Sequence, residues 1–188
     1  IRIAIDKKIP MAAGLAGGSA DGAAVMRALA RLWELNVSPQ DLAALSAQIG
    51  ADVPFCLMGQ EGQFCALAEG IGEQLSPVRP LSAWVMLSKP PVCVPTKEVY
   101  ANLCLDECQS HPDIEQMIKG LDTHNLPLVT ANMENLLESA ALRLYPEIVQ
   151  TKEAIEQLRT ASAVLMSGSG PTVFGIYMNQ EKQKVHIG

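Results

Sequence analysis

The sequence predicts an α+β protein of two domains, and three features support this fold class. Apolar residues alternate at the start of the chain, and a run of small residues then leads into helical spacing. Two prolines in the stretch SPVRPLS interrupt the pattern near Pro80. Beyond this break, the apolar segments follow the order β-α-α-α-β-β, which is typical of mixed helix and sheet layers. We therefore expect a first domain over residues 1–79 and a second over residues 80–188.

The first domain is expected to begin with a strand and a long helix. Residues 1–5 alternate isoleucine with arginine and alanine, which is the period-two pattern of a half-buried strand. Ser19 or Asp21 can cap a helix that runs to about Leu35. Its apolar residues recur at three- and four-residue spacing and form one face, which consists of Val25, Met26, Leu29, Leu32 and Trp33.

A second helix and a pair of strands should complete this domain. Ser38 is a good N-cap, Pro39 suits the first helical position, and Gly50 would end the helix. The stretch FCLMGQEGQFCALAEG is typical of two short strands around a turn at Gly59–Gly62.

The second domain is expected to contain three strands and three helices. AWVMLSKP has the pattern of a buried strand, and PTKEVYANLC that of a helix begun by Pro95 and Thr96. Two amphipathic helices follow over Asn132–Tyr145 and 146–160, the second opened by Pro146. AVLMSGSGPTVFGIYM predicts a strand, a glycine turn and a strand.

Composition excludes several classes of protein. Hydrophobic residues make up 48% of the chain and charged residues 18%, which is a globular composition. A net charge of −6 disfavours a general nucleic-acid binder, and no apolar run approaches the ~20 residues that cross a bilayer. The five cysteines are scattered without a C-x-x-C pair, which indicates reduced thiols in a cytoplasmic protein. Cys104 and Cys108 could share a helical face, but packing explains them better than a metal does.

The glycine-rich loop is the first candidate functional site. Gly14, Gly17 and Gly18 lie where a strand is expected to give way to a helix. Glycine lets the backbone approach a ligand closely, and the unpaired amides at a helix start favour phosphate. The spacing matches neither G-x-G-x-x-G nor G-K-[ST], so both common phosphate fingerprints fail. A flexible turn before a helix is the alternative.

Two further stretches could carry chemistry. Asp52, in GADVPF, lies on a short turn where a carboxylate could orient a hydroxyl or accept its proton, although turns often contain aspartate for structural reasons. The stretch MSGSGPT, residues 166–172, predicts a tight turn rich in amide donors that could approach a phosphate. An ordinary hairpin turn is the alternative there.

These sites, in this order, resemble the motifs of the GHMP kinases. IPMAAGLAGGSADGAA resembles the family's phosphate loop, which reads like P-x-A-G-L-G-G-G-S-S-D-A-A, and IGADVPF resembles its catalytic aspartate segment. ALAEGIGEQLSPV, KPPVCVPTKEVY and LMSGSGPTVFGIY resemble later motifs, so the resemblance covers almost the whole chain. The implied fold is an N-terminal part like domain 2 of ribosomal protein S5, here incomplete, followed by a ferredoxin-like C-terminal domain.

The resemblance implies a reaction and a set of residues. The reaction is transfer of the γ-phosphoryl group of ATP to the 2-hydroxyl of 4-diphosphocytidyl-2-C-methyl-D-erythritol, in non-mevalonate isoprenoid synthesis. Asp52 would be the base or orienting group, Thr96 and Tyr100 would lie near the cytidine, and Mg²⁺ would be held mainly by phosphates and water. Gly168, Ser169 and Gly170 would close over the reacting centre. The residues implied to wrap the triphosphate are Met11, Ala12, Ala13, Gly14, Leu15, Ala16, Gly17, Gly18, Ser19 and Ala20.

The chain also departs from the family pattern. Ala16 and Ala20 stand where Gly and Ser are more usual. The resemblance implies an N-terminal segment with a lysine beside the catalytic aspartate, and no equivalent lysine can be assigned, since Lys7 and Lys8 belong to the expected first strand. We therefore expect weak kinase activity, or none, from these residues alone. The alternatives are another GHMP small-molecule kinase and a non-catalytic nucleotide-binding remnant; the oligomeric state stays open.

Overall fold

The computed structural model describes residues 1–60, 65–105 and 112–178. The chain divides into two compact units, which are described separately below. Unit 1 contains residues 1–10 and 16–80, and unit 2 contains residues 11–15 and 81–188. The five-residue segment 11–15 thus belongs with the second unit, although its neighbours on both sides belong with the first. None of the described helices has the length and hydrophobicity needed to cross a bilayer.

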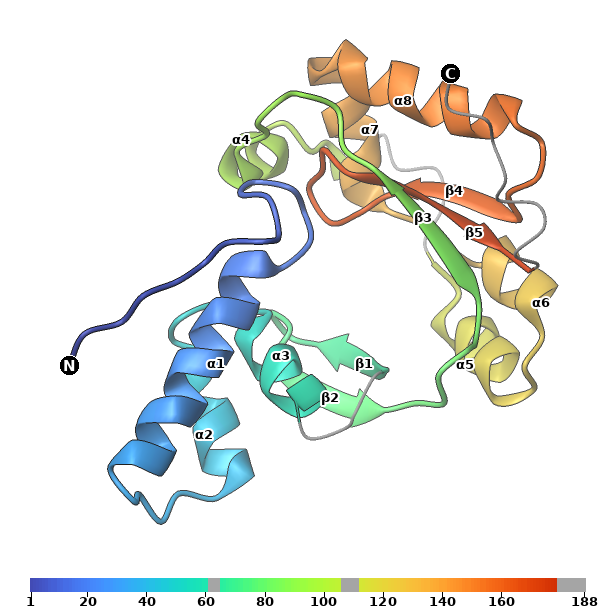
Figure 1. Cartoon of the computed structure of the whole chain (residues 1–188). Helices are drawn as coiled ribbons and strands as arrows, with labels where there is room; N and C mark the ends of the chain where they lie inside the picture. The colour runs from blue at the N-terminus through green and yellow to red at the C-terminus, as the bar shows by residue number, and fades with distance from the viewer. Residues whose placement is uncertain (61–64, 106–111, 179–188) are drawn as a thin grey trace. The chain divides into compact units, whose positions relative to one another are not determined.

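The described residues of unit 1 form three helices and a two-stranded antiparallel sheet (Figure 1). Ala23, Val53 and Leu57 form its small buried cluster, against which Met26 and Leu42 pack. The elements are α1 (Gly17–Leu32), α2 (Pro39–Ser46), α3 (Val53–Gln60), β1 (Ala66–Glu69) and β2 (Gln74–Pro77).

The caps expected for α2 are confirmed. Ser38 is the N-cap, its hydroxyl oxygen accepts the amide of Asp41 at 3.1 Å, and Pro39 is the first helical residue. The helix ends at Ser46, earlier than the Gly50 stop that we expected, and Gly50 follows a short turn.

Three expectations for unit 1 are wrong. Residues 1–5 form no strand and their isoleucines are exposed, because no strand of the described chain pairs with them. α1 begins at Gly17 after an Ala16 N-cap and ends at Leu32, so neither Ser19 nor Asp21 caps it. The first half of the expected strand pair is helix α3, since a short apolar run fits a buried helix as well as a strand. The second half contributes β1, and the expected turn residue Gly62 lies outside the described residues.

Among its described residues, unit 2 contains a three-stranded antiparallel sheet in the order β3-β5-β4, with helix α8 along one face (Figure 1). A Cβ atom on Gly175 of the central strand would lie 3.1 Å from Ile155 of α8, so this glycine allows close packing of helix on sheet. The elements are β3 (Trp84–Ser88), α4 (Thr96–Ala101), α5 (Ile114–Asp122), α6 (Leu126–Ala131), α7 (Leu136–Leu144), α8 (Pro146–Gln157), β4 (Ala163–Met166) and β5 (Val173–Tyr177).

The core of unit 2 joins the sheet to α4, α7 and α8. Val99, Ile148, Met166 and Val173 are each at most 1% exposed and belong to one apolar cluster. Its members come from helices and strands that are far apart in the sequence, so the cluster fixes where α4 and the β4–β5 turn lie within this unit.

The predicted order of elements in this half is confirmed in part. The β4–turn–β5 hairpin, helix α4 and the opening of α8 by Pro146 match the prediction. The predicted helix over Asn132–Tyr145 is the shorter α7, and α5 and α6 were not predicted. β3 is a strand but not a buried one, because it lies at the sheet edge with Trp84 46% and Leu87 55% exposed. Cys104 lies outside any helix, and Cys108 lies outside the described residues.

Candidate active site

The loop over residues 11–15 is fastened to the turn between β4 and β5. The hydroxyl of Ser167 donates a hydrogen bond to the carbonyl oxygen of Gly14 at 2.7 Å, and the amide of Thr172 donates to the carbonyl of Ala13 at 3.4 Å. Gly14 has a φ of +70°, and a Cβ atom there would lie 2.3 Å from the carbonyl oxygen of Ser167. Only glycine fits this position, for both its conformation and its space.

The β4–β5 turn is itself compact and hydrogen-bonded. The amide of Ser167 donates to the carbonyl of Thr172 at 2.8 Å, and the amide of Gly170 to the carbonyl of Ser167 at 2.9 Å. Gly168 and Gly170 both have positive φ, at 56° and 82°. Of the residues predicted from MSGSGPT, Ser169 is nearly buried at 7% exposure.

Helix α4 brings the two predicted substrate residues to the surface of unit 2. Val99 on the inner face is fully buried and anchors the helix, whereas Tyr100 is 60% exposed. The hydroxyls of Thr96 and Ser169 lie 2.8 Å apart and share a hydrogen bond. Two residues that the sequence analysis placed at the site are therefore in contact, and the Tyr100 ring is accessible for stacking on a base.

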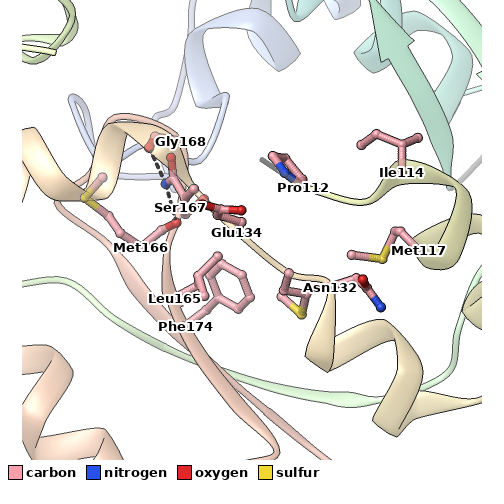
Figure 2. Close-up of a pocket in the computed structure, with 12 residues that line it drawn as sticks. Pro112, Ile114, Met117, Asn132, Glu134, Leu165, Met166, Ser167, Gly168 and Phe174 are labelled. Carbon is pink, nitrogen blue, oxygen red and sulfur yellow. Dashed lines mark hydrogen bonds between the residues drawn. The ribbon is translucent and has the colours of Figure 1, made fainter. Parts of the chain in front are cut away.

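A cavity of about 430 Å³ opens beside the same turn (Figure 2). Its walls are the segment 112–117, the segment 132–135 and the adjoining ends of β4 and β5. Figure 2 shows Leu165 and Phe174 on the sheet side, with Ile114 and Met117 facing them across the opening. Of the predicted site residues, Gly168 alone lines this cavity.

In unit 1, the start of α1 has the features of an anion site. Ala16, the N-cap residue, has a φ of +50° and its side chain makes no capping hydrogen bond. The first amides of a helix lack intrahelical partners and carry the positive end of the helix dipole. Gly17 is buried, and a Cβ atom there would lie 2.8 Å from Ile9. At Gly18, apart from its chain neighbours and the backbone of its own helix, no heavy atom of the described chain lies within 4 Å of the Cβ position, so the space beside it is open.

Lys7 lies at the first turn of α1, a position that was not predicted. Its ammonium group lies 2.6 Å from the carboxylate of Asp21, and 3.3 Å from where a Cβ atom on Gly17 would stand. Both side chains are about one-third exposed, at 32%. A cation is thus present at the first turn of α1. A lysine and an aspartate fourteen residues apart form no sequence pattern, so only the fold reveals the pair.

Asp52 immediately precedes α3 and is exposed. Its carbonyl oxygen accepts the amide of Cys56 at 3.1 Å, and Val53 beside it is buried against α1. A Cβ atom on Gly22, in the second turn of α1, would lie 3.9 Å from Val53. The backbone of the predicted catalytic segment therefore packs near the beginning of α1. Burial, and after it the charge of Asp52, raises the pKa of the Cys56 thiol.

Two stretches of this chain match the profiles of the two domains of one protein family. Residues 1–60 match the family profile "GHMP kinases N terminal domain", and residues 117–185 match "GHMP kinases C terminal". The chain belongs to the GHMP kinase family.

Individual relatives narrow the comparison within that family. The chain is 44% identical over 187 residues to a 4-diphosphocytidyl-2-C-methyl-D-erythritol kinase of Brevibacillus brevis, covering 99% of this chain and 62% of the relative. It is 45% identical over 190 residues to the kinase of the same name from Bacillus subtilis, covering 100% of this chain and 64% of the relative. The chain thus spans less than two thirds of the length of these relatives.

Solved structures agree with the family assignment. The chain matches a crystal structure of 4-(cytidine 5'-diphospho)-2C-methyl-D-erythritol kinase with a TM-score of 0.75 and 34% identity, over 94% of this chain and 62% of the other. A homoserine kinase from Cytophaga hutchinsonii matches with a TM-score of 0.70, over 94% of this chain and 60% of the other. At 21% identity, the second match bears on the fold alone.

Proposed function

We propose that these residues carry the phosphate loop, the catalytic aspartate and part of the substrate site of an ATP-dependent kinase. Its acceptor would be the 2-hydroxyl of 4-diphosphocytidyl-2-C-methyl-D-erythritol. The observation that supports this most is the 44–45% identity, along essentially the whole chain, to relatives that bear the name of that kinase. The open space beside Gly18 and the uncapped first turn of α1 add a physical reason for phosphate.

The nucleotide is assigned to residues 11–20. Phosphoryl transfer needs positioning and charge compensation more than covalent chemistry, so backbone amides and nearby cations can supply much of what the reaction requires. Amides at the start of α1 would hold phosphate oxygens, and Lys7 would offset their negative charge. Lys7 would then have to exchange its contact with Asp21 in part for the nucleotide.

Asp52 is assigned to the acceptor hydroxyl. An exposed carboxylate on a constrained turn can orient a hydroxyl group and accept its proton as the bond to phosphorus forms. In unit 2, Thr96 and Tyr100 would contact the cytidine, and residues 168–170 would close over the reacting groups. We assign the protein to the cytoplasm, where its nucleotide is available.

Mg²⁺ fits this arrangement as a companion of the nucleotide. No cluster of three or more potential ligands occurs among the described His, Cys, Asp and Glu side chains. Mg²⁺ commonly keeps several waters and binds through phosphates with one or two carboxylates, so a cage made of protein is not required. When bound, the ion would supply charge neutralisation at the transferred phosphoryl group.

The test combines a substrate panel with one substitution. In the whole protein that contains these residues, ADP release should require the cytidine-linked methylerythritol, and it should not occur with methylerythritol phosphate, homoserine or mevalonate. Asp52→Asn should lower kcat by about 100-fold or more, as loss of a general base does. Glu153→Gln removes an exposed carboxylate on α8 and should leave kcat unchanged.

The outcomes separate the candidate functions. Transfer to homoserine or mevalonate instead would assign a different kinase of the family. Nucleotide binding by the whole protein in calorimetry, without transfer to any acceptor, would favour a non-catalytic binding protein. Full activity of Asp52→Asn would remove that residue from the mechanism.

A further inference from the structure

The side chain at the start of helix α7 makes hydrogen bonds to the β4–β5 turn in addition to the bond that caps the helix. Asn135 is the N-cap of α7, and its Oδ1 accepts the amide of Leu137 at 3.0 Å. Its Nδ2 donates to two carbonyl oxygens, those of Met166 and Gly168, each at 2.8 Å. Figure 2 draws these two bonds as dashed lines beside Ser167. One side chain thus caps a helix and also holds the last residue of β4 and one residue of the turn.

Glu138, three residues later in α7, binds the residue that immediately precedes the same turn. Its Oε1 accepts the amide of Met166 at 3.0 Å, and its Oε2 pairs with the ammonium of Lys152 at 2.8 Å. Both side chains are mostly buried, with 14% of Glu138 and 20% of Lys152 exposed. Met166 therefore has both its amide and its carbonyl bound by side chains of the α7 segment, immediately before the glycine turn begins.

The turn is itself hydrogen-bonded to the loop 11–15, so fixing the turn also restrains the loop. Ser167 follows Met166 directly, and its hydroxyl donates to the carbonyl oxygen of Gly14. The carbonyl of Ser167 stands 2.3 Å from the Cβ position of Gly14, so a displaced turn would press on the loop or release it. The restraint thus extends from α7 through the turn to the loop, all within unit 2.

We propose that Asn135 is a positioning residue for nucleotide binding, which it serves by fixing the β4–β5 turn against which the loop 11–15 is held. Glu138 supports it by fixing Met166. The proposal rests on the proposed function, because it assumes that the loop contacts the triphosphate. Misplacement of a binding group by about 1 Å can cost on the order of 100-fold in rate, so such a restraint matters for phosphoryl transfer.

Asn135→Asp separates the two roles of this side chain. Aspartate keeps an oxygen that can cap α7, and caps of Asp and Asn are of similar quality. It loses both Nδ2 donors, however, and turns a carboxylate oxygen toward the carbonyls of Met166 and Gly168. Asn125→Asp is the matched control. Asn125 caps α6 through the amide of Leu128, and it makes no hydrogen bond to the turn in the part of the chain that the structure describes.

The first measurement is amide hydrogen exchange of Ser167 and Gly170, whose amides are bonded inside the turn. Exchange should be at least about tenfold faster in Asn135→Asp than in wild type, as expected for the loss of two hydrogen bonds. Asn125→Asp should leave it unchanged. The comparison is made well below the unfolding midpoint of each variant, where circular dichroism shows all three proteins to be folded.

The second measurement is the Kd of a non-hydrolysable ATP analogue with Mg²⁺, determined by titration calorimetry. Asn135→Asp should raise this Kd by about tenfold or more, with the number of sites unchanged. A purely structural role would lower the number of sites, through loss of folded protein, and would leave the Kd as it is. Asn125→Asp should match the wild type in both quantities.

The results decide the two proposals separately. Wild-type exchange rates in Asn135→Asp would show that the residue does not hold the turn and would overturn the inference. Faster exchange with an unchanged Kd would overturn its role in nucleotide binding. A wild-type protein that binds no nucleotide would overturn the proposed function, while the exchange rates would still decide whether Asn135 restrains the turn.

Discussion

Gly14→Ala should destabilise the protein because the new methyl group has no room. The Cβ atom would lie 2.3 Å from the carbonyl oxygen of Ser167 and 2.9 Å from that of Gly170, whereas ordinary contact begins near 3.4 Å. Both neighbours are backbone atoms, so no side chain can rotate away. Alanine at a φ of +70° costs about 1–2 kcal/mol, and forced overpacking typically costs about 1–3 kcal/mol. We expect a loss of about 2–5 kcal/mol.

Gly18→Ala, four residues further along the chain, is the matched control. Apart from its chain neighbours and the backbone of its own helix, no described heavy atom lies within 4 Å of its Cβ position, and the residue lies in α1, where alanine is favoured over glycine by up to about 1 kcal/mol. Its stability should equal or slightly exceed that of the wild type. If Gly18 faces bound phosphate as proposed, the same methyl group should weaken nucleotide binding without affecting the fold.

The assay is thermal unfolding of both variants by calorimetry. For a chain of this size, 1 kcal/mol shifts the midpoint by about 2–4 °C, so Gly14→Ala should unfold at least about 5 °C below the wild type. Equal midpoints for Gly14→Ala and the wild type would refute the close approach of this loop to the β4–β5 turn. Equal losses in Gly14→Ala and Gly18→Ala would refute the steric explanation.

Three further predictions concern caps, strain and thiols. Ser38→Ala removes the acceptor of the Asp41 amide and should cost about 0.5–2 kcal/mol in chemical denaturation, whereas Ser38→Asp should not. Ala16→Gly should raise the unfolding midpoint or leave it unchanged. The left-handed φ of +50° disfavours alanine by about 1–2 kcal/mol, and the entropic cost of fixing a glycine there is smaller. A lower midpoint would contradict this. Burial raises the pKa of the Cys56 and Cys65 thiols, so the unfolded chain ionises first and stability should fall as the pH rises above about 8.5. Midpoints measured from pH 7 to 10 should decline less in Cys56→Ala than in the wild type, and an equal decline would exclude Cys56 as a contributor.

Local signals in the sequence predicted several elements correctly. Ser38 and Pro39 mark the start of α2, and Pro146 marks the start of α8, because caps and proline act through neighbouring backbone groups. The glycine turn between β4 and β5 was also predicted, since positive φ angles at Gly168 and Gly170 demand that residue type.

Elements that depend on distant partners were not predictable in this way. The alternating residues 1–5 have the pattern of a strand, but a strand also needs a neighbour that donates and accepts hydrogen bonds. α3 is apolar on several sides because it packs into the small cluster with α1, and its short run has no periodicity to distinguish helix from strand. Tertiary packing determined both outcomes.

In the candidate site, too, local motifs could be predicted from the sequence, whereas contacts between distant residues could not. Motif resemblance supplied residues 11–20, Asp52 and the turn residues, and their assigned roles stay predictions. The Lys7–Asp21 pair and the contacts of Asn135 required the fold, because they join residues 14 and 31 or more positions apart. An asparagine three residues before a glutamate could have suggested a helix start at Asn135, but not the turn that it holds.

The membership of residues 11–15 in the second unit has a practical consequence for expression. A gene fragment that starts at Leu81 would encode the β4–β5 hairpin without the short peptide whose carbonyls receive the Ser167 hydroxyl and the Thr172 amide. In such a product, these two donors would lack the acceptors that residues 11–15 provide. Cutting the chain between Pro80 and Leu81 would therefore not give two domains that each keep all their internal hydrogen bonds. Circular permutants that keep this peptide joined to the hairpin are the better choice for studying the second unit in isolation.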